Sequence, residues 1–152
     1  MTTMRIEDEI KQSAFKSEFH KAYINLLYTS NFLEQEHGNL LKPFGLTTPQ
    51  YNILRILRGQ HPKPATVSLL IERMLDKTSN ASRIVDKLEA KDLVTRKQCS
   101  NDRRTVDVLI TDKGLALLKE IDVLDDNTRT GIHNLTEEET REFNRLLDKI
   151  RD

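Results

Sequence analysis

The sequence LVTRKQCSNDRRTVDVLI occupies residues 93–110 and has the pattern of a β-hairpin. Apolar side chains alternate with others over residues 105–110, and a period of two predicts a strand. Residues 93–98 are predicted to form the partner strand, and the polar residues 99–104 the loop between the two strands. Two adjacent arginines therefore lie near the tip of the predicted hairpin.

A helix is predicted immediately before this hairpin, over about residues 78–91. Ala81, Ile84, Val85 and Leu88 lie on one side of it at helical spacing. Short polar and basic side chains occupy the rest of its surface, mainly in the first two turns. The candidate contact residues of this segment are Thr78, Ser79, Asn80, Ser82, Arg83 and Lys87.

Three more helices are predicted towards the N-terminus. Residues 7 to about 36 carry apolar side chains at spacings of three and four, which is typical of one amphipathic helix. A second helix, over residues 47–58, opens with a capping box between Thr47 and Gln50. A short third helix follows from Thr66.

Two helices are predicted after the hairpin. The first begins at Thr111, and the second opens with another capping box, between Thr136 and Glu139. The last helix is expected to bury Phe143, Leu146, Leu147 and Ile150, which recur at helical spacing.

The composition suits one domain, or one protomer of a small oligomer. The chain has 152 residues, of which 37% are hydrophobic, and no Trp, so its own core is lean. Its longest apolar run, residues 115–118, is far shorter than the roughly 20 residues that cross a membrane. The N-terminus has no signal-peptide pattern, and we expect a cytoplasmic protein with no membrane association. A single cysteine, Cys99, excludes an internal disulfide framework and a multi-cysteine zinc site.

The charge is distributed unevenly, although its total is zero. Residues 77–104 contain eight Lys and Arg against four Asp and Glu, a net charge of +4, whereas residues 105–152 have a net charge of −5. Phosphate binding depends on the local patch rather than on the total, so residues 77–104 are candidates for contact with a nucleic acid.

A helix, a short helix, a polar-faced helix and a basic hairpin follow one another in the order of a winged helix-turn-helix. An α-helix fits the major groove of B-DNA, and its first residues reach the edges of the bases. Arg83 could bind O6 and N7 of guanine in a fork. Arg103 and Arg104 on the hairpin could reach phosphates or the minor groove.

Four segments resemble the MarR (multiple-antibiotic-resistance regulator) family. Asp102-Arg103-Arg104, followed after five residues by Ile110-Thr111-Asp112-Lys113-Gly114, resembles the wing signature of the family. Residues 46–51 resemble the opening of its second helix, residues 83–89 its recognition helix, and residues 93–96 the strand that follows.

The resemblance implies a mainly α (α+β) fold over one domain, residues 1–152. It consists of a winged helix-turn-helix with a two- to three-stranded antiparallel β-wing over residues 46–112, flanked by dimerisation helices over 5–36 and 113–152. The resemblance also implies that Asp102 braces a wing arginine. The chain departs from the family at Asp92, where a glycine is usual. Asp tolerates the left-handed conformation better than most residues.

The resemblance implies a homodimeric, sequence-specific transcription regulator, usually a repressor, that binds a near-palindromic operator in double-stranded DNA. A small-molecule effector, aromatic or other, would release it, in a crevice lined by Phe15, Phe19 and Tyr23. The apolar stripes at both ends of the chain indicate the dimer interface. The residues expected there are Phe15, Phe19, Leu118, Ile121, Phe143, Leu147 and Ile150.

Other functions have less support in the sequence. No nucleophile elbow, phosphate loop or HExxH motif is present, so we expect neither an enzyme nor a cofactor, and no catalytic or metal-binding residue is assigned. Cys99 would suit a redox sensor, but an incidental cysteine at a strand end is favoured. The main alternative is an interaction module of the same fold that has lost DNA binding, against which Arg83, Arg103 and Arg104 count.

Overall fold

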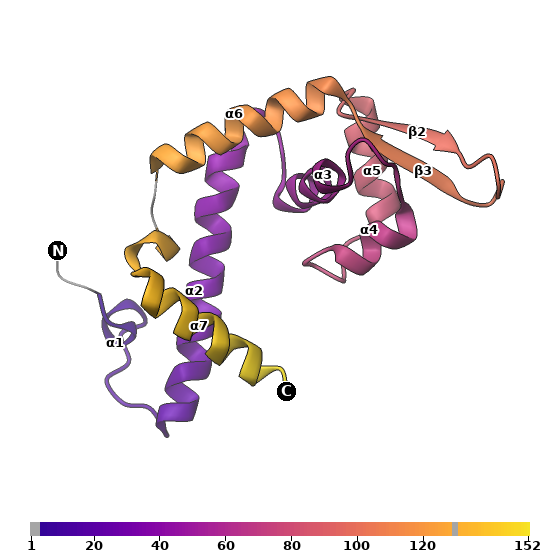
Figure 1. Ribbon diagram of the computed structural model, residues 1–152. Coiled ribbons are helices and arrows are strands. Elements are labelled where there is room, and N and C mark those ends of the chain that lie inside the picture. The colour runs from indigo at the N-terminus through magenta and orange to yellow at the C-terminus, as the bar shows by residue number, and fades with distance from the viewer. Residues whose placement is uncertain (1–3, 129–130) are drawn as a thin grey trace. The chain divides into compact units, whose positions relative to one another are not determined.

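The computed structural model describes residues 4–128 and 131–152 (Figure 1). The chain divides into two compact units, one up to Asn39 and one from Leu40 onward. The first unit contains α1 (Ile6–Glu9) and most of α2 (Glu18–Leu41). Among the described residues, no helix has the length and apolar character that crossing a membrane requires.

The single helix predicted over residues 7 to about 36 is wrong at its N-terminal end. The chain leaves the helix after Glu9, and Lys11 has a φ of +52°, in the left-handed region. Helix α2 then starts at Glu18, where the Ser17 hydroxyl accepts a hydrogen bond from the His20 N–H at 3.1 Å. The apolar stripe continues through the break in sequence, which is why periodicity alone missed it.

Contacts between polar side chains hold α1 to α2. The Lys21 ammonium lies 2.6 Å from Glu7 Oε1, and the Tyr28 hydroxyl donates to Glu9 Oε2 at 2.6 Å. The hydrogen bond from Lys21 is the main reason why the pKa of Glu7 is lowered to about 2. The first unit is therefore held partly by charged contacts on α1.

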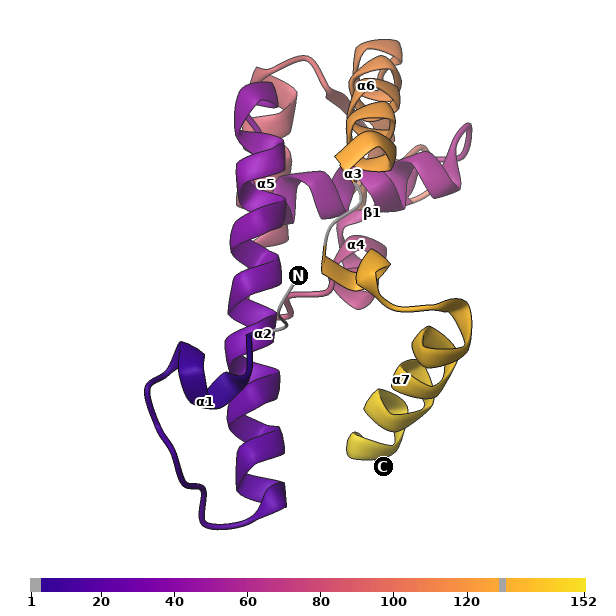
Figure 2. The same ribbon diagram turned by 90° about the vertical axis from the view of Figure 1, so that its left-hand side faces the viewer.

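The second unit contains five α-helices and three strands among its described residues (Figure 1). The α-helices are α3 (Thr48–Gln60), α4 (Val67–Arg73), α5 (Ala81–Ala90), α6 (Asp112–Thr128) and α7 (Glu137–Ile150), with 3-10 helices η1 (Lys42–Phe44) and η2 (Gly131–Asn134). Both predicted capping boxes are confirmed, at Thr47 with Gln50 and at Thr136 with Glu139. The chain passes from α3 through β1 (Ala65–Thr66) into α4 (Figure 2).

The predicted hairpin is confirmed as β2 (Val94–Gln98) and β3 (Val106–Ile110), which are antiparallel with Arg96 opposite Val108. The short β1 pairs with the other edge of β3, so the strand order is β1-β3-β2. The mainly helical fold with a small antiparallel sheet, expected from the sequence, is confirmed.

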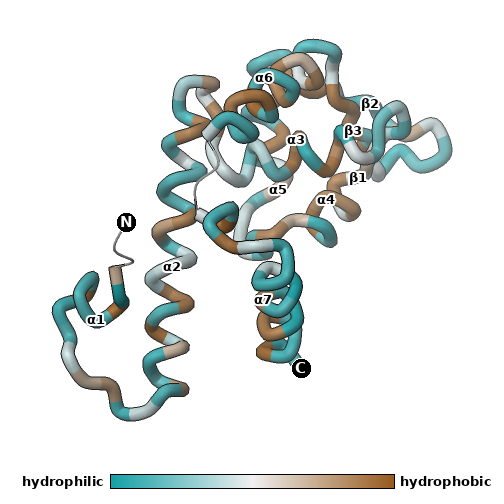
Figure 3. The backbone as a smooth tube through the Cα atoms, turned by 60° about the vertical axis from the view of Figure 1, so that its left-hand side comes forward, coloured by the Kyte–Doolittle hydropathy of each residue, from teal (hydrophilic) through white to brown (hydrophobic). Residues whose placement is uncertain are grey.

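The core of the second unit joins α3, α4, α5 and α6 to the sheet. Apolar segments of these elements are brown in Figure 3. Its fully buried side chains include Ile53, Leu54, Leu57, Leu70, Val85, Leu88, Val108, Leu118 and Ile121. Full burial of such a side chain is worth roughly 1.5–3 kcal/mol. Leu118 and Ile121 are 0% exposed within one chain, so their predicted place in a dimer interface is wrong.

Helix α7 does not bury the residues expected from its sequence. Phe143 and Leu147 are half-buried, whereas Leu146 is 44% and Ile150 67% exposed. None of the residues of α7 is fully buried. The predicted burial of Leu146 and Ile150 is therefore not found in the single chain, and contact of this stripe with a second copy stays a prediction.

Close backbone packing joins the hairpin to α5 and α6. Asp92, just after α5, has a φ of +59°, in the left-handed region that favours glycine. This is the position where the chain has Asp although the resemblance implies a glycine. Its carbonyl accepts a hydrogen bond from the Thr111 hydroxyl at 2.7 Å. A Cβ on Gly114 would lie 2.5 Å from the Leu93 carbonyl oxygen and 2.7 Å from Ile110 Cγ1. Only a glycine lets the first turn of α6 approach the sheet this closely.

Candidate nucleic-acid interface

The turn between α4 and α5 is organised by one carboxylate. Asp76 accepts hydrogen bonds from the Thr78 N–H at 2.9 Å, the Thr78 hydroxyl at 2.6 Å and the Ser79 hydroxyl at 2.8 Å. These bonds, led by that of the Thr78 side chain, lower the pKa of Asp76. The role of Asp76 was not predicted from the sequence, although Asp followed two and three residues later by Thr and Ser is a turn signal.

Helix α5 begins at Ala81, so the predicted start at about residue 78 is wrong by about three residues. Asn80 is the N-cap, and its Oδ1 accepts from the Arg83 N–H at 3.1 Å. Thr78 and Ser79 lie in the turn before the helix rather than in its first turn. Local hydrogen bonding by these short polar side chains competes with helix formation and moves the helix start forward.

The outer face of α5 begins with Ser82 and Arg83, which are exposed, and continues with the exposed Lys87. Ala81 and Val85 point to the core and are 2% and 0% exposed. The helix therefore separates a buried apolar side from a polar outer side, as predicted. Its side chains at the N-terminal end are short except for Arg83, which suits close approach to a groove.

The tip of the β2–β3 hairpin is held by side chains that bind its backbone. Asp102 accepts from the Arg104 N–H at 2.9 Å and from the Thr105 hydroxyl at 3.1 Å. The Gln98 amide donates to the Arg103 carbonyl at 2.7 Å. Among the described residues, no ion pair joins Asp102 to a guanidinium, so it braces the turn through the main chain. Figure 3 shows this tip mostly in teal, the hydrophilic colour.

The eight basic residues of the segment 77–104 fall into two groups. Three are occupied by internal contacts: Lys77 with the Ile71 and Glu72 carbonyls, Lys91 with the Gly45 carbonyl, and Arg96 with two carboxylates. In the part of the chain that the structure describes, the other five make no side-chain hydrogen bond or ion pair. These are Arg83, Lys87, Lys97, Arg103 and Arg104. Lys97 was not singled out from the sequence, although it lies in the basic segment.

Arg96 links the hairpin to α5. Its Nη2 lies 2.5 Å from Asp86 Oδ1 and 3.2 Å from Glu89 Oε1. Its pKa is raised, first by the hydrogen bond with Glu89 and then by that with Asp86. The contact draws two α5 carboxylates towards β2, and it fixes the strand relative to the helix. An exposed basic helix end and an exposed basic hairpin tip thus belong to one connected scaffold (Figure 1).

The residues predicted to line an effector crevice lie in the first unit. The Phe15 ring is half-buried, with its centroid 6.2 Å from that of His20. Phe19 is 90% and Tyr23 62% exposed, so these two form no wall of a closed crevice within residues 4–39. A crevice lined by all three stays a prediction. No group of three or more His, Cys, Asp or Glu suited to a metal ion occurs among the described residues.

Comparisons with known proteins agree with this arrangement. Residues 46–106 match the sequence profile of the MarR family. MgrA, an HTH-type transcriptional regulator of Staphylococcus aureus, is 29% identical over 113 residues, which are 74% of this chain and 75% of MgrA.

Two solved structures share the fold. A mutant of MarR from E. coli, solved in complex with operator DNA, has a TM-score of 0.75 at 23% identity, over 91% of this chain and 99% of that one. The PcaV transcriptional regulator from Streptomyces coelicolor, solved in complex with its natural ligand, has a TM-score of 0.67 at 23% identity, over 81% and 89%.

Proposed function

Because this chain belongs to the MarR family of winged-helix transcription regulators, we propose that it is a homodimeric repressor of transcription. It binds a near-palindromic operator in double-stranded DNA through residues 46–112, and it dimerises through helices within 5–36 and 113–152. It acts on DNA in the cytoplasm and is a regulator rather than an enzyme. The observation that carries the proposal is the pairing of two exposed basic elements, the start of α5 and the hairpin tip.

The first turns of α5 read bases in the major groove. Arg83 is exposed and has no acidic partner among the described residues, so its guanidinium can donate two hydrogen bonds to a guanine edge. Ser82 and the turn residues Thr78 and Ser79 supply short contacts beside it, and Asn80 mainly holds the helix start. Lys87, further along the same exposed face, contacts a phosphate.

The hairpin tip contacts the DNA backbone or the minor groove. Asp102 and Gln98 bind the main chain of the tip. The side chains of Arg103 and Arg104 are exposed and make no ion pair among the described residues, so both can bind a partner outside the chain. Contacts of this kind position the protein and contribute the salt-dependent part of affinity.

Dimerisation is supported by apolar side chains that one chain leaves exposed. Phe19 on α2 is 90% exposed, and Ile150 on α7 is 67% exposed. Exposed apolar surface of this kind marks an interaction site. A twofold dimer would present two copies of α5 to half-sites about 10 base pairs apart, centre to centre.

Release by a small-molecule effector completes the proposal. PcaV, a protein of the same fold, was solved with its natural ligand, which supports a ligand-responsive function for this chain as well. Phe15, Phe19 and Tyr23 are the residues we assign to the effector crevice. A screen of small aromatic compounds for release of bound operator tests this part independently of DNA binding.

Selection of bound sequences from random double-stranded DNA tests the main proposal. We expect a near-palindrome to emerge, and Arg83→Ala and Arg103→Ala to weaken its binding. Lys119→Ala, which removes one exposed charge from α6, is the matched control and should bind as the wild type does. Failure to enrich any sequence would favour the alternative, an interaction module of the same fold without DNA binding.

A further inference from the structure

Helix α6 leaves the core of the second unit at one definite point. Leu118 and Ile121 are 0% exposed and belong to the core. Two and three residues after Ile121, Val123 is 57% and Leu124 39% exposed, and residues 125–128 are exposed as well. Ile121 is thus the last α6 side chain that the core encloses.

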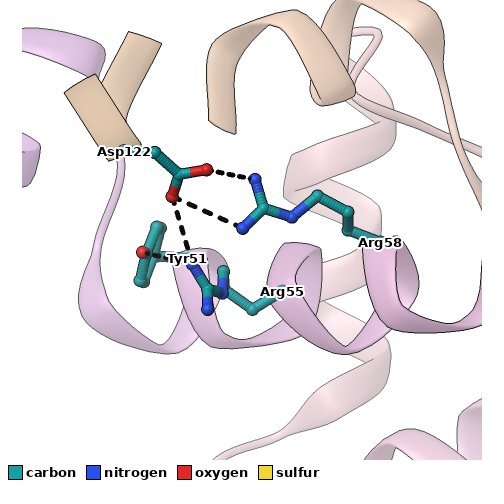
Figure 4. A network of polar contacts seen from close by, with 4 residues as sticks. All are labelled: Tyr51, Arg55, Arg58 and Asp122. Carbon is teal, nitrogen blue, oxygen red and sulfur yellow. Dashed lines mark hydrogen bonds and ion pairs between the residues drawn. The ribbon is translucent and has the colours of Figure 1, made fainter. Parts of the chain in front are cut away.

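Asp122 directly follows that residue and contacts two arginines of α3 (Figure 4). Arg58 Nη1 lies 2.6 Å from Asp122 Oδ2, and Arg58 Nη2 lies 3.4 Å from Oδ1. Arg55 Nη1 lies 3.1 Å from the same Oδ1 and 3.4 Å from the Tyr51 hydroxyl. One carboxylate therefore accepts from both guanidinium groups.

The two arginines are fixed supports because α3 itself is fixed. Ile53, Leu54 and Leu57, which lie between or beside them in sequence, are 0–1% exposed in the core. A planar guanidinium that binds both oxygens of a carboxylate determines its direction as well as its distance. The side chains of Arg58 and Asp122 are 29% and 39% exposed, so this pair contributes more to geometry than to the stability of the fold.

We propose that Asp122 is a positioning residue for operator binding: by holding α6 to α3, it sets the distance between the two recognition helices of the dimer. This inference rests on the proposed function, since it needs a dimer on two half-sites. The chain beyond Asp122 leads to α7, whose apolar face is open to a second copy, whereas α3 is part of the core that carries α5.

A small change of angle at this point is enough to matter. Helix α3 has 13 residues, so its length is about 20 Å. A rotation of about 10° over that length moves the far end by about 3.5 Å, close to the rise of one base pair. Loosening the Asp122 contacts would therefore make the dimer less selective for the spacing between half-sites. The base preference within each half-site would not change.

The test compares binding to operators in which the two half-sites are moved apart or together by one and two base pairs. The variants are Asp122→Asn, which keeps the shape but removes the charge, and Arg58→Lys, which keeps the charge but removes the fork. Asp125→Asn is the matched control, because it removes one exposed charge from the same helix three residues later. The thermal unfolding of each variant is measured as a control, and a cooperative transition indicates that the variant is folded.

We expect the wild type and Asp125→Asn to prefer one spacing sharply. Asp122→Asn should lose about three- to tenfold in affinity at that spacing and lose much less at the neighbouring ones. Base preference within a half-site should stay the same. A spacing profile of Asp122→Asn that matches the wild type, or an equal loss at every spacing, would overturn the inference. If the wild type itself binds no operator, it is the proposed function that fails.

Discussion

Arg83 and Arg103 have different surroundings, and on this difference we propose that they contribute differently to DNA binding. Arg83 lies in the first turn of a rigid helix whose start is capped by Asn80. We expect Arg83→Ala to cost about 1–3 kcal/mol of binding free energy per half-site and to relax the preference at one base position. Affinities for a panel of single-base operator mutants measure both effects.

Arg103 lies at the hairpin tip, where its carbonyl is held by Gln98 and its side chain is exposed. Arg103→Ala should weaken binding to most sequences alike and make the dependence on salt shallower. The same operator panel at two salt concentrations separates this result from that of Arg83→Ala. Uniform weakening by Arg83→Ala together with altered base preference in Arg103→Ala would reverse the two assignments.

Gly114 is required by close packing rather than by its backbone angles. An added Cβ would clash with the carbonyl oxygen of Leu93, a main-chain atom that cannot move away by a change of rotamer. We expect Gly114→Ala to lower the free energy of unfolding by about 1–3 kcal/mol.

Gly59→Ala is the matched control for this substitution. Gly59 lies in α3, and an added Cβ would have nothing within 4 Å. Stability should therefore stay the same or rise by about 0.5–1 kcal/mol, because alanine favours a helix. Denaturant unfolding measures both variants, and equal stability of the Gly114→Ala variant and the wild type would contradict the close approach.

At the scale of elements, the start of a helix was predicted correctly where a capping box in the sequence marks it. The Thr47 and Thr136 boxes placed α3 and α7 correctly, because the signal is local and each hydrogen bond lies within four residues. The start of α5 was misplaced because Asp76 draws Thr78 and Ser79 into a turn, which competes with the helix. Burial on α7 was misjudged because amphipathicity shows which side is apolar but not what covers it.

The sequence predicted one basic segment as the candidate DNA-contacting surface, but it did not show which of its basic residues have partners within the chain. Charge counting marks residues 77–104 as one patch. Only the structure shows that Lys91 and Arg96 are occupied by contacts with Gly45 and with two carboxylates. The partners of Asp122 could not be predicted from the sequence either, since Arg58 lies 64 residues away along the chain.

The attachment of α1 to α2 should depend on pH. The pKa of Glu7 is about 2, below its ordinary value of 4.5, because its charged form is bound by Lys21. A lowered carboxyl pKa stabilises the folded form above pH 4.5, and this contribution is lost as the pH falls towards 2. We expect the amides of α1 to lose protection from hydrogen exchange over that range.

Glu7→Gln should remove this dependence on pH and leave α1 less protected at neutral pH. Glu18→Gln, an exposed carboxylate at the start of α2, is the matched control and should behave as the wild type does. Hydrogen exchange of residues 6–10 in all three proteins, at several pH values, measures the effect. Identical pH profiles for the Glu7→Gln variant and the wild type would show that the ion pair does not hold α1.

For the whole molecule, we expect a dimer at micromolar concentration. Within one chain, more than half of the surface of Phe19, Tyr23 and Ile150 is exposed. Large apolar side chains exposed in this way are typical of a surface that is buried in an interface. Ile150→Glu should weaken self-association, whereas Lys149→Glu, which changes an exposed neighbour, should not. Light scattering over a range of concentrations measures the mass, and a monomeric wild type would contradict the dimer.

The most direct test of operator recognition is the affinity of the wild-type protein for a selected palindrome and for a single half-site at two salt concentrations. We expect the palindrome to bind much more tightly than the half-site. Its affinity should fall by a factor of about 10³–10⁵ between 50 and 200 mM salt, as for 6–10 phosphate contacts. Equal affinity for the palindrome and the half-site, or affinity that does not change with salt, would contradict two-site recognition by α5 and the basic hairpin.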